Sequence, residues 1–281
     1  MNGAETGDTL IEVDGLVKRF GDHFVLNGVS FEVRRGDTFV IMGGSGCGKS
    51  TLLRHLIGLE TPTSGTVRIL GREVSALGDR ALQELRMKFG MLFQSGALLQ
   101  SLTIAENVAL PLREHANLEP GLIDITVKMK LEQVGLTGHG DKLPSEISGG
   151  MRKRAALARA MAMDPELVFS DEPTAGLDPV MTAVVDELTL DVTRKIGATV
   201  VVVTHDMASV FRIATKIIML GTGDHQGTIV TSGTPEEVQD DPNPIVQQFI
   251  RGEPDGPLRM QSSGEEYGVV LLGTGVQANQ G

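Results

Sequence analysis

The 281-residue sequence is poor in cysteine and aromatic residues, with one cysteine, one tyrosine and no tryptophan. A lone thiol, Cys47, excludes an internal disulfide and a cysteine-based zinc site, which favours a reducing compartment. Apolar runs of 18 or more residues are also missing, and the segment from Met1 to Asp8 lacks the basic and apolar regions of a signal peptide. We therefore expect a protein that stays in the cytosol and reaches a membrane only through a partner.

Positive charge is also scarce. The chain has 25 Lys and Arg against 36 Asp and Glu, which gives a formal net charge of −11. Broad binding to nucleic acid or to anionic lipid needs clustered cationic side chains, so we expect no nucleic acid among the partners. With 41% hydrophobic and 22% charged residues, the composition is typical of a folded protein with one large α/β domain or two smaller ones.

The pattern of apolar residues predicts strands and helices in alternation. Short apolar runs in residues 10–42 indicate strands, and buried strands are expected again at 167–169 and 199–203. A helical segment at 179–194 separates the last two strands. Between about residues 95 and 163 the periodicity is helical, which predicts a helical subdomain. Strands alternating with helices imply an α/β fold with a mostly parallel sheet covered on both faces.

A glycine-rich loop at residues 43–50 follows an early strand and precedes a helix expected over residues 51–59. Glycines let successive main-chain N–H groups turn toward one centre, and the helix N-terminus adds its positive end, so such a loop cradles phosphates. Lys49 is placed to hold the β- and γ-phosphates, and the Ser50 hydroxyl to bind Mg²⁺. A chance glycine turn is the alternative, which the strand-loop-helix context disfavours. The residues predicted to hold the nucleotide here are Gly43, Gly44, Ser45, Gly46, Cys47, Gly48, Lys49, Ser50 and Thr51.

The apolar strand that begins at Leu167 is expected to end in two acidic residues, Asp171 and Glu172, directly before a proline. Neighbouring strand residues point to opposite faces, so the two carboxylates are expected to take different roles. Asp171 is placed to hold Mg²⁺ through its water shell, and Glu172 to orient and deprotonate the attacking water. Two acids on a solvated loop are the alternative, which the buried strand and the upstream phosphate loop disfavour.

Three further motifs carry a family resemblance. They are Ser148-Gly149-Gly150-Met151, Ala175-Gly176-Leu177-Asp178 and Thr204-His205-Asp206. In this order, with the phosphate loop and the two acids, the sequence resembles the ATPase domain of ABC transporters up to about Arg251. The resemblance implies a P-loop NTPase core of RecA-like type with an N-terminal antiparallel β subdomain and an inserted helical subdomain at about 95–163. It also implies ATP hydrolysis with ATP and Mg²⁺ as cofactors.

The resemblance also assigns roles outside the phosphate loop. Gln94 is the loop glutamine that couples the nucleotide to the membrane partner, His205 contacts the γ-phosphate, and Phe20 stacks on adenine. Without the resemblance, His205 would be an ordinary core or surface histidine. The catalytic residues implied are Glu172, His205, Lys49 and Gln94. The metal-binding residues implied are Ser50, Gln94 and Asp171.

The signature motif at Ser148, Gly149 and Gly150 has a physical reading of its own. Ser148 is a good N-cap, and the two glycines expose main-chain N–H groups at a helix start, an arrangement that attracts phosphate. Read alone, Ser148 would be only a helix cap. In the family this end completes the site of the opposite protomer, so hydrolysis requires a homodimer, and Asp178 belongs to the same nucleotide site. The cationic run at residues 152–154 is expected to be a solvated helix face, with help in binding the partner's phosphate as the alternative.

Narrower features are similar to the ATPase of Mla/Mce-type phospholipid transport systems. They lie at residues 93–99, 101–108 and 111–115. This branch implies a subunit on the cytoplasmic side of the inner membrane, held there by a permease, with an Mce-domain lipid-binding protein and a STAS-domain accessory protein as further partners. The domain is expected to span 1–251, and the tail at 252–281 to reach the neighbouring protomer through Tyr267 and residues 269–272.

Other functions stay open at this point. An importer ATPase for amino acids or another small solute differs only in the region after Gln94. A soluble ABC ATPase of translation or DNA repair usually has two cassettes or a coiled-coil insertion, and this sequence has neither. A module that binds ATP without turnover is disfavoured by the intact Glu172 and His205.

Overall fold

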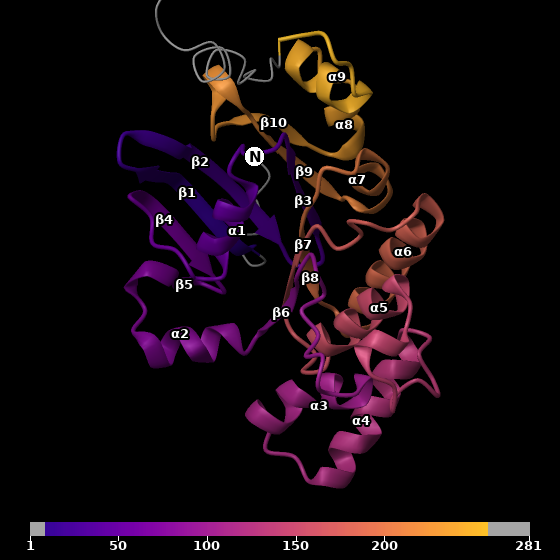
Figure 1. Cartoon of the computed structure of the whole chain (residues 1–281). Helices are drawn as coiled ribbons and strands as arrows, with labels where there is room; N and C mark the ends of the chain where they lie inside the picture. Colours follow the sequence, from indigo (N-terminus) through magenta and orange to yellow (C-terminus); the bar gives the residue numbers. More distant parts are fainter. Residues whose placement is uncertain (1–8, 258–281) are drawn as a thin grey trace, which may run out of the picture.

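The structure, a computed structural model, describes residues 9–257 and places two sheets side by side (Figure 1). A four-stranded antiparallel sheet has the order β2-β1-β4-β5, and a six-stranded sheet has the order β10-β9-β3-β8-β7-β6. The strands of the first sheet are β1 Thr9–Phe20, β2 His23–Arg34, β4 Ser64–Ile69 and β5 Arg72–Glu73. Those of the second are β3 Thr38–Gly43, β6 Phe89–Leu92, β7 Leu167–Asp171, β8 Thr199–Val203, β9 Lys216–Leu220 and β10 Ile229–Gly233.

The six-stranded sheet is parallel from β9 to β6, and only the edge strand β10 runs antiparallel to its neighbour. β3 and β8 are buried at every position, as expected of central parallel strands that are covered on both faces. Because the parallel strands share one direction, the loops that leave β3, β6, β7 and β8 emerge at the same edge of the sheet. This edge collects most of the predicted site residues.

Side chains of β3 alternate between two hydrophobic cores on opposite faces of this sheet. Phe39 and Ile41 belong to one core, which includes α1 (Lys49–Leu56) and the antiparallel sheet. Val40 and Met42 belong to the other, which includes the helices α5 (Gly149–Ala160), α6 (Pro179–Ile196) and α7 (Met207–Ile213). The helix after the phosphate loop and the helix after the signature motif therefore cover opposite faces (Figure 1).

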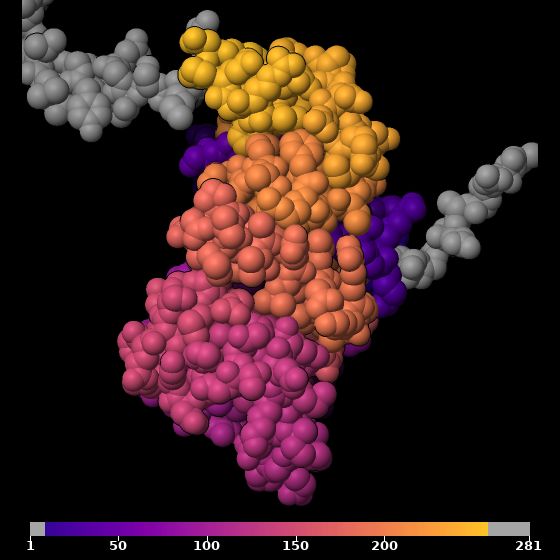
Figure 2. Space-filling view, turned by 90° about the vertical axis from the view of Figure 1, so that its right-hand side faces the viewer, coloured from indigo at the N-terminus to yellow at the C-terminus, as the bar shows by residue number. Residues whose placement is uncertain are grey.

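The segment after β6 is helical and forms the lower end of the molecule in Figure 2. α3 (Ile104–His115) begins with a capping box between Thr103 and Glu106, and α4 (Pro120–Gln133) begins with a proline at its first turn. Both pack with α5 in the second core. The remaining helices are α2 Asp79–Arg86, α8 Pro235–Gln239 and α9 Pro244–Arg251, with 3-10 turns at η1 Val74–Ala76, η2 Pro144–Glu146 and η3 Gly223–His225.

The predicted α/β class, the mostly parallel sheet and the N-terminal antiparallel sheet are confirmed. The helix expected over 51–59 begins two residues earlier, at Lys49, because Gly48 already serves as its N-cap. Within residues 9–257, no helix has the length and hydropathy needed to cross a bilayer. The proposed tail anchors, Tyr267 and residues 269–272, lie outside the described residues, and the domain limits stay a prediction.

Candidate nucleotide-binding and hydrolysis site

The phosphate loop joins the buried end of β3 to the first turn of α1. Gly43 and Gly48 have φ angles of 146° and 104°, which side chains rarely tolerate. A Cβ at Gly43 would lie 2.5 Å from the carbonyl oxygen of Leu220, and one at Gly48 would lie 2.7 Å from that of Val25. Glycine is therefore required at both ends of the loop, and the main chain between them is free to face a ligand.

Lys49 is the first residue of α1, and its ammonium lies within the loop. Nζ donates hydrogen bonds to the carbonyl oxygens of Gly43 and Gly44 at 2.7 and 2.9 Å. Gln226 Nε2 donates to the carbonyl oxygen of Gly46 at 3.0 Å. The Cys47 thiol is buried, which raises its pKa and keeps it protonated. Lys49 thus supplies a positive charge at the N-terminal end of α1, where phosphate binding is favourable.

Asp171 and Glu172 lie at the end of β7, but the strand ends at Asp171. Glu172 has a φ of 46°, so a backbone turn in the left-handed region, rather than strand alternation, separates the two side chains. The expectation that both are strand residues is wrong. Burial, together with the neighbouring charge of Glu172, raises the pKa of Asp171. A cation beside Asp171 would offset both effects.

Glu172 is held by the loop that follows β8. Nδ1 of His205 lies 2.7 Å from Oε1 of Glu172, and the Thr204 hydroxyl donates to Oε2 at 3.3 Å. An ionised Glu172 needs the proton on Nδ1, which leaves Nε2 of His205 as the outward-facing ring nitrogen. The His205 side chain is 67% exposed, so it can contact a ligand while it orients Glu172. Sequence reasoning missed Thr204, although it belongs to the same motif.

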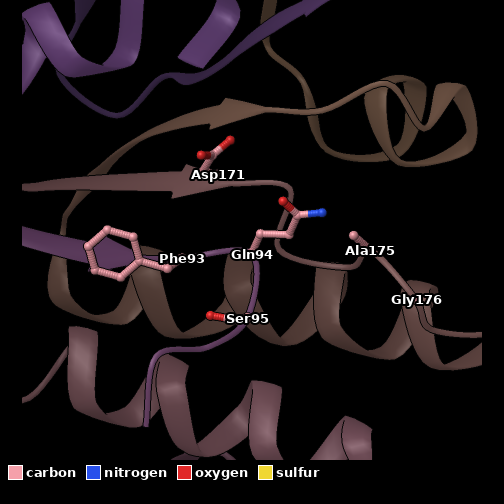
Figure 3. A pocket seen from close by; sticks show the side chains of 6 residues that line it. All are labelled: Phe93, Gln94, Ser95, Asp171, Ala175 and Gly176. Atoms are coloured by element: carbon pink, nitrogen blue, oxygen red, sulfur yellow. The ribbon is translucent and has the colours of Figure 1, made fainter. Parts of the chain in front are cut away.

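Gln94 lies in the loop after β6, on one wall of a cavity of about 600 Å³. Figure 3 shows its carboxamide directed into the space between Asp171 and Ala175, whereas the Phe93 ring points the opposite way. Phe93, Ser95 and Gly176 complete the lining. The structure thus brings Gln94 and Asp171 to one cleft, whereas Ser50, the third residue of the predicted metal set, is exposed and does not line it.

The donors near this cleft suit a hard divalent cation such as Mg²⁺. Within residues 9–257 no group of three or more His, Cys, Asp and Glu could bind a metal by itself. A cation at Asp171 would therefore take its other ligands from neutral oxygens of the cleft, such as the Gln94 carboxamide, and from phosphate. The raised pKa of Asp171 indicates a carboxylate that such a charge would stabilise.

The signature residues lie apart from this cleft. Ser148 caps α5 as expected, with its hydroxyl accepting from the Met151 N–H at 3.3 Å. Gly150 is buried against α6, since a Cβ there would lie 2.6 Å from the Met181 methyl carbon. Because α5 and α1 cover opposite faces of the sheet, one chain does not bring Ser148 to the phosphate loop. Asp178 caps α6 by accepting from the N–H groups of residues 180 and 181.

The prediction of a solvated face at 152–154 holds only for Arg152, which is exposed, and is wrong for the buried Lys153. Lys153 is only 8% exposed and donates to the main-chain oxygen of Gln94. Arg154 donates to the carbonyl oxygens of Val134 and Gly135 at 3.0 and 3.1 Å. Three consecutive residues span about 200° of a helix, so one of them readily faces the core, which the prediction did not consider.

Phe20 ends β1, and its ring is 54% exposed. The Lys18 ammonium lies 4.9 Å from the ring centroid, a cation–π geometry that leaves most of the ring open. An exposed aromatic ring can stack on a planar base, so its position agrees with the predicted role, which stays a prediction.

A strand followed by a glycine loop and lysine, with a second strand of the same sheet that ends in a half-buried carboxylate, defines a P-loop nucleoside triphosphatase. β8 separates the two strands and is parallel to both, so Asp171 lies at the same edge of the sheet as the loop.

Comparison with known proteins narrows the class. Residues 26–175 match the family model described as ABC transporter. The chain is 40% identical over 258 residues to the intermembrane phospholipid transport system ATP-binding protein MlaF of Haemophilus influenzae, covering 92% of this chain and 96% of that protein. It is also 40% identical to the probable ribonucleotide transport ATP-binding protein mkl of Mycobacterium leprae, covering 91% and 73%.

Solved structures agree with this match. The dimeric post-hydrolysis structure of the ATP-binding cassette MJ0796 bound to ADP and Pi superposes with a TM-score of 0.71 at 30% identity, covering 80% of this chain and 99% of that one. The chain therefore belongs to the ABC transporter family, as an ATP-hydrolysing subunit, which confirms the resemblance. The roles of individual site residues stay predictions.

Proposed function

We propose that this chain powers phospholipid transport through a membrane permease, in a system of the Mla/Mce type. The observation that carries the proposal is the 40% identity to a phospholipid transport ATPase over 96% of that protein's length. The region after Gln94, which is similar to this branch in sequence, forms the loop at the cleft and the helices α3 and α4.

The residues of the cleft divide the work of hydrolysis. The loop and Lys49 hold the phosphates, and Ser50, Gln94 and Asp171 are the oxygen donors for Mg²⁺, which when bound would neutralise phosphate charge. Glu172 accepts a proton from the attacking water, because its carboxylate is fixed by hydrogen bonds from the Thr204 hydroxyl and the His205 ring. Fixing the base before the reaction lowers the cost of orienting it.

A second copy of the chain completes the site in this proposal. The N-terminus of α5, with Ser148 and Gly149, lies on the opposite face of the sheet from the phosphate loop, so a single chain leaves it without a phosphate to bind. Two copies facing each other would place each signature helix over the loop of the other. The dimeric state of the related MJ0796 cassette supports this arrangement.

The remaining partners follow from the same proposal. The homodimer lies on the cytoplasmic side of the inner membrane, bound to permease subunits, with an Mce-domain lipid-binding protein and a STAS-domain accessory protein in the assembly. The similarity to MlaF supports membership of a phospholipid transport system, from which this set of partners is proposed. ATP binding draws the two copies together and hydrolysis releases them, and the loop at Gln94 passes the movement to the permease.

Ribonucleotide transport is the second candidate, because the mkl relative has the same identity of 40%. The test is to purify the chain with its membrane partners in mild detergent and identify bound small molecules by mass spectrometry. We expect co-purified phospholipid, and ATP-dependent transfer of a fluorescent phospholipid by the assembly in liposomes. Uptake of labelled ribonucleotide without phospholipid transfer would contradict the proposal.

A further inference from the structure

Two cations of α5 hold the main chain of the loop that carries Gln94. The Lys153 ammonium donates to the carbonyl oxygen of Gln94. The Arg159 guanidinium donates through Nη1 to the carbonyl oxygen of Ala97 at 2.6 Å and through Nη2 to that of Gly96 at 2.9 Å. The loop is therefore attached to the signature helix at three carbonyl groups.

The conformation of the loop explains why it needs these bonds. Gly96 and Ala97 have φ angles of 74° and 47°, so two consecutive residues occupy the left-handed region. Ala97 has a side chain there, which costs about 1 kcal/mol or more unless the surroundings enforce the conformation. The Arg159 fork supplies that constraint at both carbonyl groups.

Lys153 is placed unusually for a structural lysine. It is 8% exposed, and burying an ammonium group costs several kcal/mol unless strong acceptors surround it. Lys130, a comparably buried lysine of α4, is paired with the Asp164 carboxylate. The hydrogen-bond acceptor of Lys153 is a neutral carbonyl, although the Glu172 carboxylate is near enough to attract its charge. Its bond to Gln94, which lines the cleft, indicates a role there.

We propose that Lys153 is a positioning residue for ATP hydrolysis, which fixes the Gln94 main chain so that the carboxamide stays in the cleft opposite Asp171. The same bond ties the loop to α5, so that Gln94 and the signature residues at the start of α5 move as one body. This proposal rests on the proposed role of Gln94. Removing the bond should slow the chemical step while the phosphate loop still binds ATP.

The test compares Lys153→Met with Lys130→Met in the full-length chain assembled with its membrane partners. Both variants remove a buried ammonium, so both should lower thermal stability. We expect the kcat for ATP to fall about tenfold in Lys153→Met with KM changed less than about twofold, because an interaction that acts at the transition state alters kcat. Lys130→Met should keep its kcat, and Lys153→Arg, which retains a donor, should recover most of the loss.

A double-mutant cycle with Gln94→Ala separates positioning from general support. If Lys153 acts through the Gln94 side chain, Lys153→Met should add no further loss of kcat to Gln94→Ala. The proposal would be overturned if the double variant lost kcat by the product of the two single losses, or if Lys153→Met had a normal kcat. Either result would leave the role of Gln94 intact. A normal kcat in Gln94→Ala would overturn both roles. If Lys153→Met fails to fold, Lys153→Gln replaces it in the double-mutant cycle with Gln94→Ala.

Discussion

The loops after β3 and β6 leave the same sheet at the same edge, yet the chain holds them in different ways. The phosphate loop is fixed mainly by its own lysine, with Lys49 bonded to the carbonyls of Gly43 and Gly44 six and five residues away, and by one distant bond from Gln226 to Gly46. The loop at Gln94 is fixed by side chains of α5, from 59 to 63 residues away along the chain.

This difference corresponds to what each loop must do. A loop fixed locally keeps its shape when other elements move, which suits the binding of phosphates. A loop bonded to a distant helix moves with that helix, which suits the transfer of movement between the nucleotide and a permease. Lys49 and Lys153 are thus both lysines that bond to loop carbonyls, but one serves binding and the other coupling.

The largest loss of ATP turnover is expected on substitution of Glu172, the proposed base. Glu172→Gln keeps the shape of the side chain but removes the base, so turnover should fall by about a hundredfold or more. ATP binding should persist, and the variant should accumulate as an ATP-bound dimer in size-exclusion chromatography. Full activity would refute the assignment of the base, whichever loop supports it.

The second-largest effect is expected on removal of the Lys49 charge from the phosphate loop. Lys49→Ala should weaken ATP binding about tenfold to a hundredfold, as expected for the loss of a charge-assisted contact. Equilibrium binding of a fluorescent ATP analogue measures the effect. Lys195→Ala is the control, since that lysine is exposed and paired with Asp191 on α6. Equal affinity in both variants would contradict the role of Lys49.

Glycine substitutions in the phosphate loop test whether its shape is set locally. Gly48→Ala should destabilise the fold by about 2 kcal/mol, because the φ of 104° is strained for alanine and the Cβ would meet the Val25 carbonyl oxygen. Gly46→Ala, where the φ is 77° and the surrounding space is open, should cost less. Urea unfolding compares the two. A larger loss for Gly46→Ala would show that the loop is held differently.

The smallest effect concerns the mobility of the loop at Gln94. Arg159→Met removes the bonds to the carbonyls of Gly96 and Ala97, so the Gly96 amide, which donates to Phe93, should exchange with solvent about threefold faster. The Cys47 amide in the phosphate loop, which donates to Gly44, should be unaffected. Hydrogen exchange followed by NMR measures the rates at both amides. Equal acceleration at both amides would erase the contrast between the two loops.

The two loops also differ in what their sequences predict. The phosphate loop was predicted in detail, because its glycines, Lys49 and the following helix are neighbours along the chain. The attachment of Gln94 to Lys153 was missed, because it depends on how α5 packs against the sheet. The turn at Glu172 was missed for a similar reason: its main-chain N–H and its carboxylate bond to Val203 and His205, at and after the end of β8.

The central claim is that each chain supplies only half of a hydrolysis site. Lys49→Ala and Ser148→Arg should each lose most of their ATPase activity when purified alone. Co-expressed, they form mixed dimers in which one site combines an intact phosphate loop with an intact signature helix. We predict recovery of up to about a quarter of the wild-type activity, since half of the dimers have one complete site. Activity in the mixture no higher than in the separate variants would contradict the shared site.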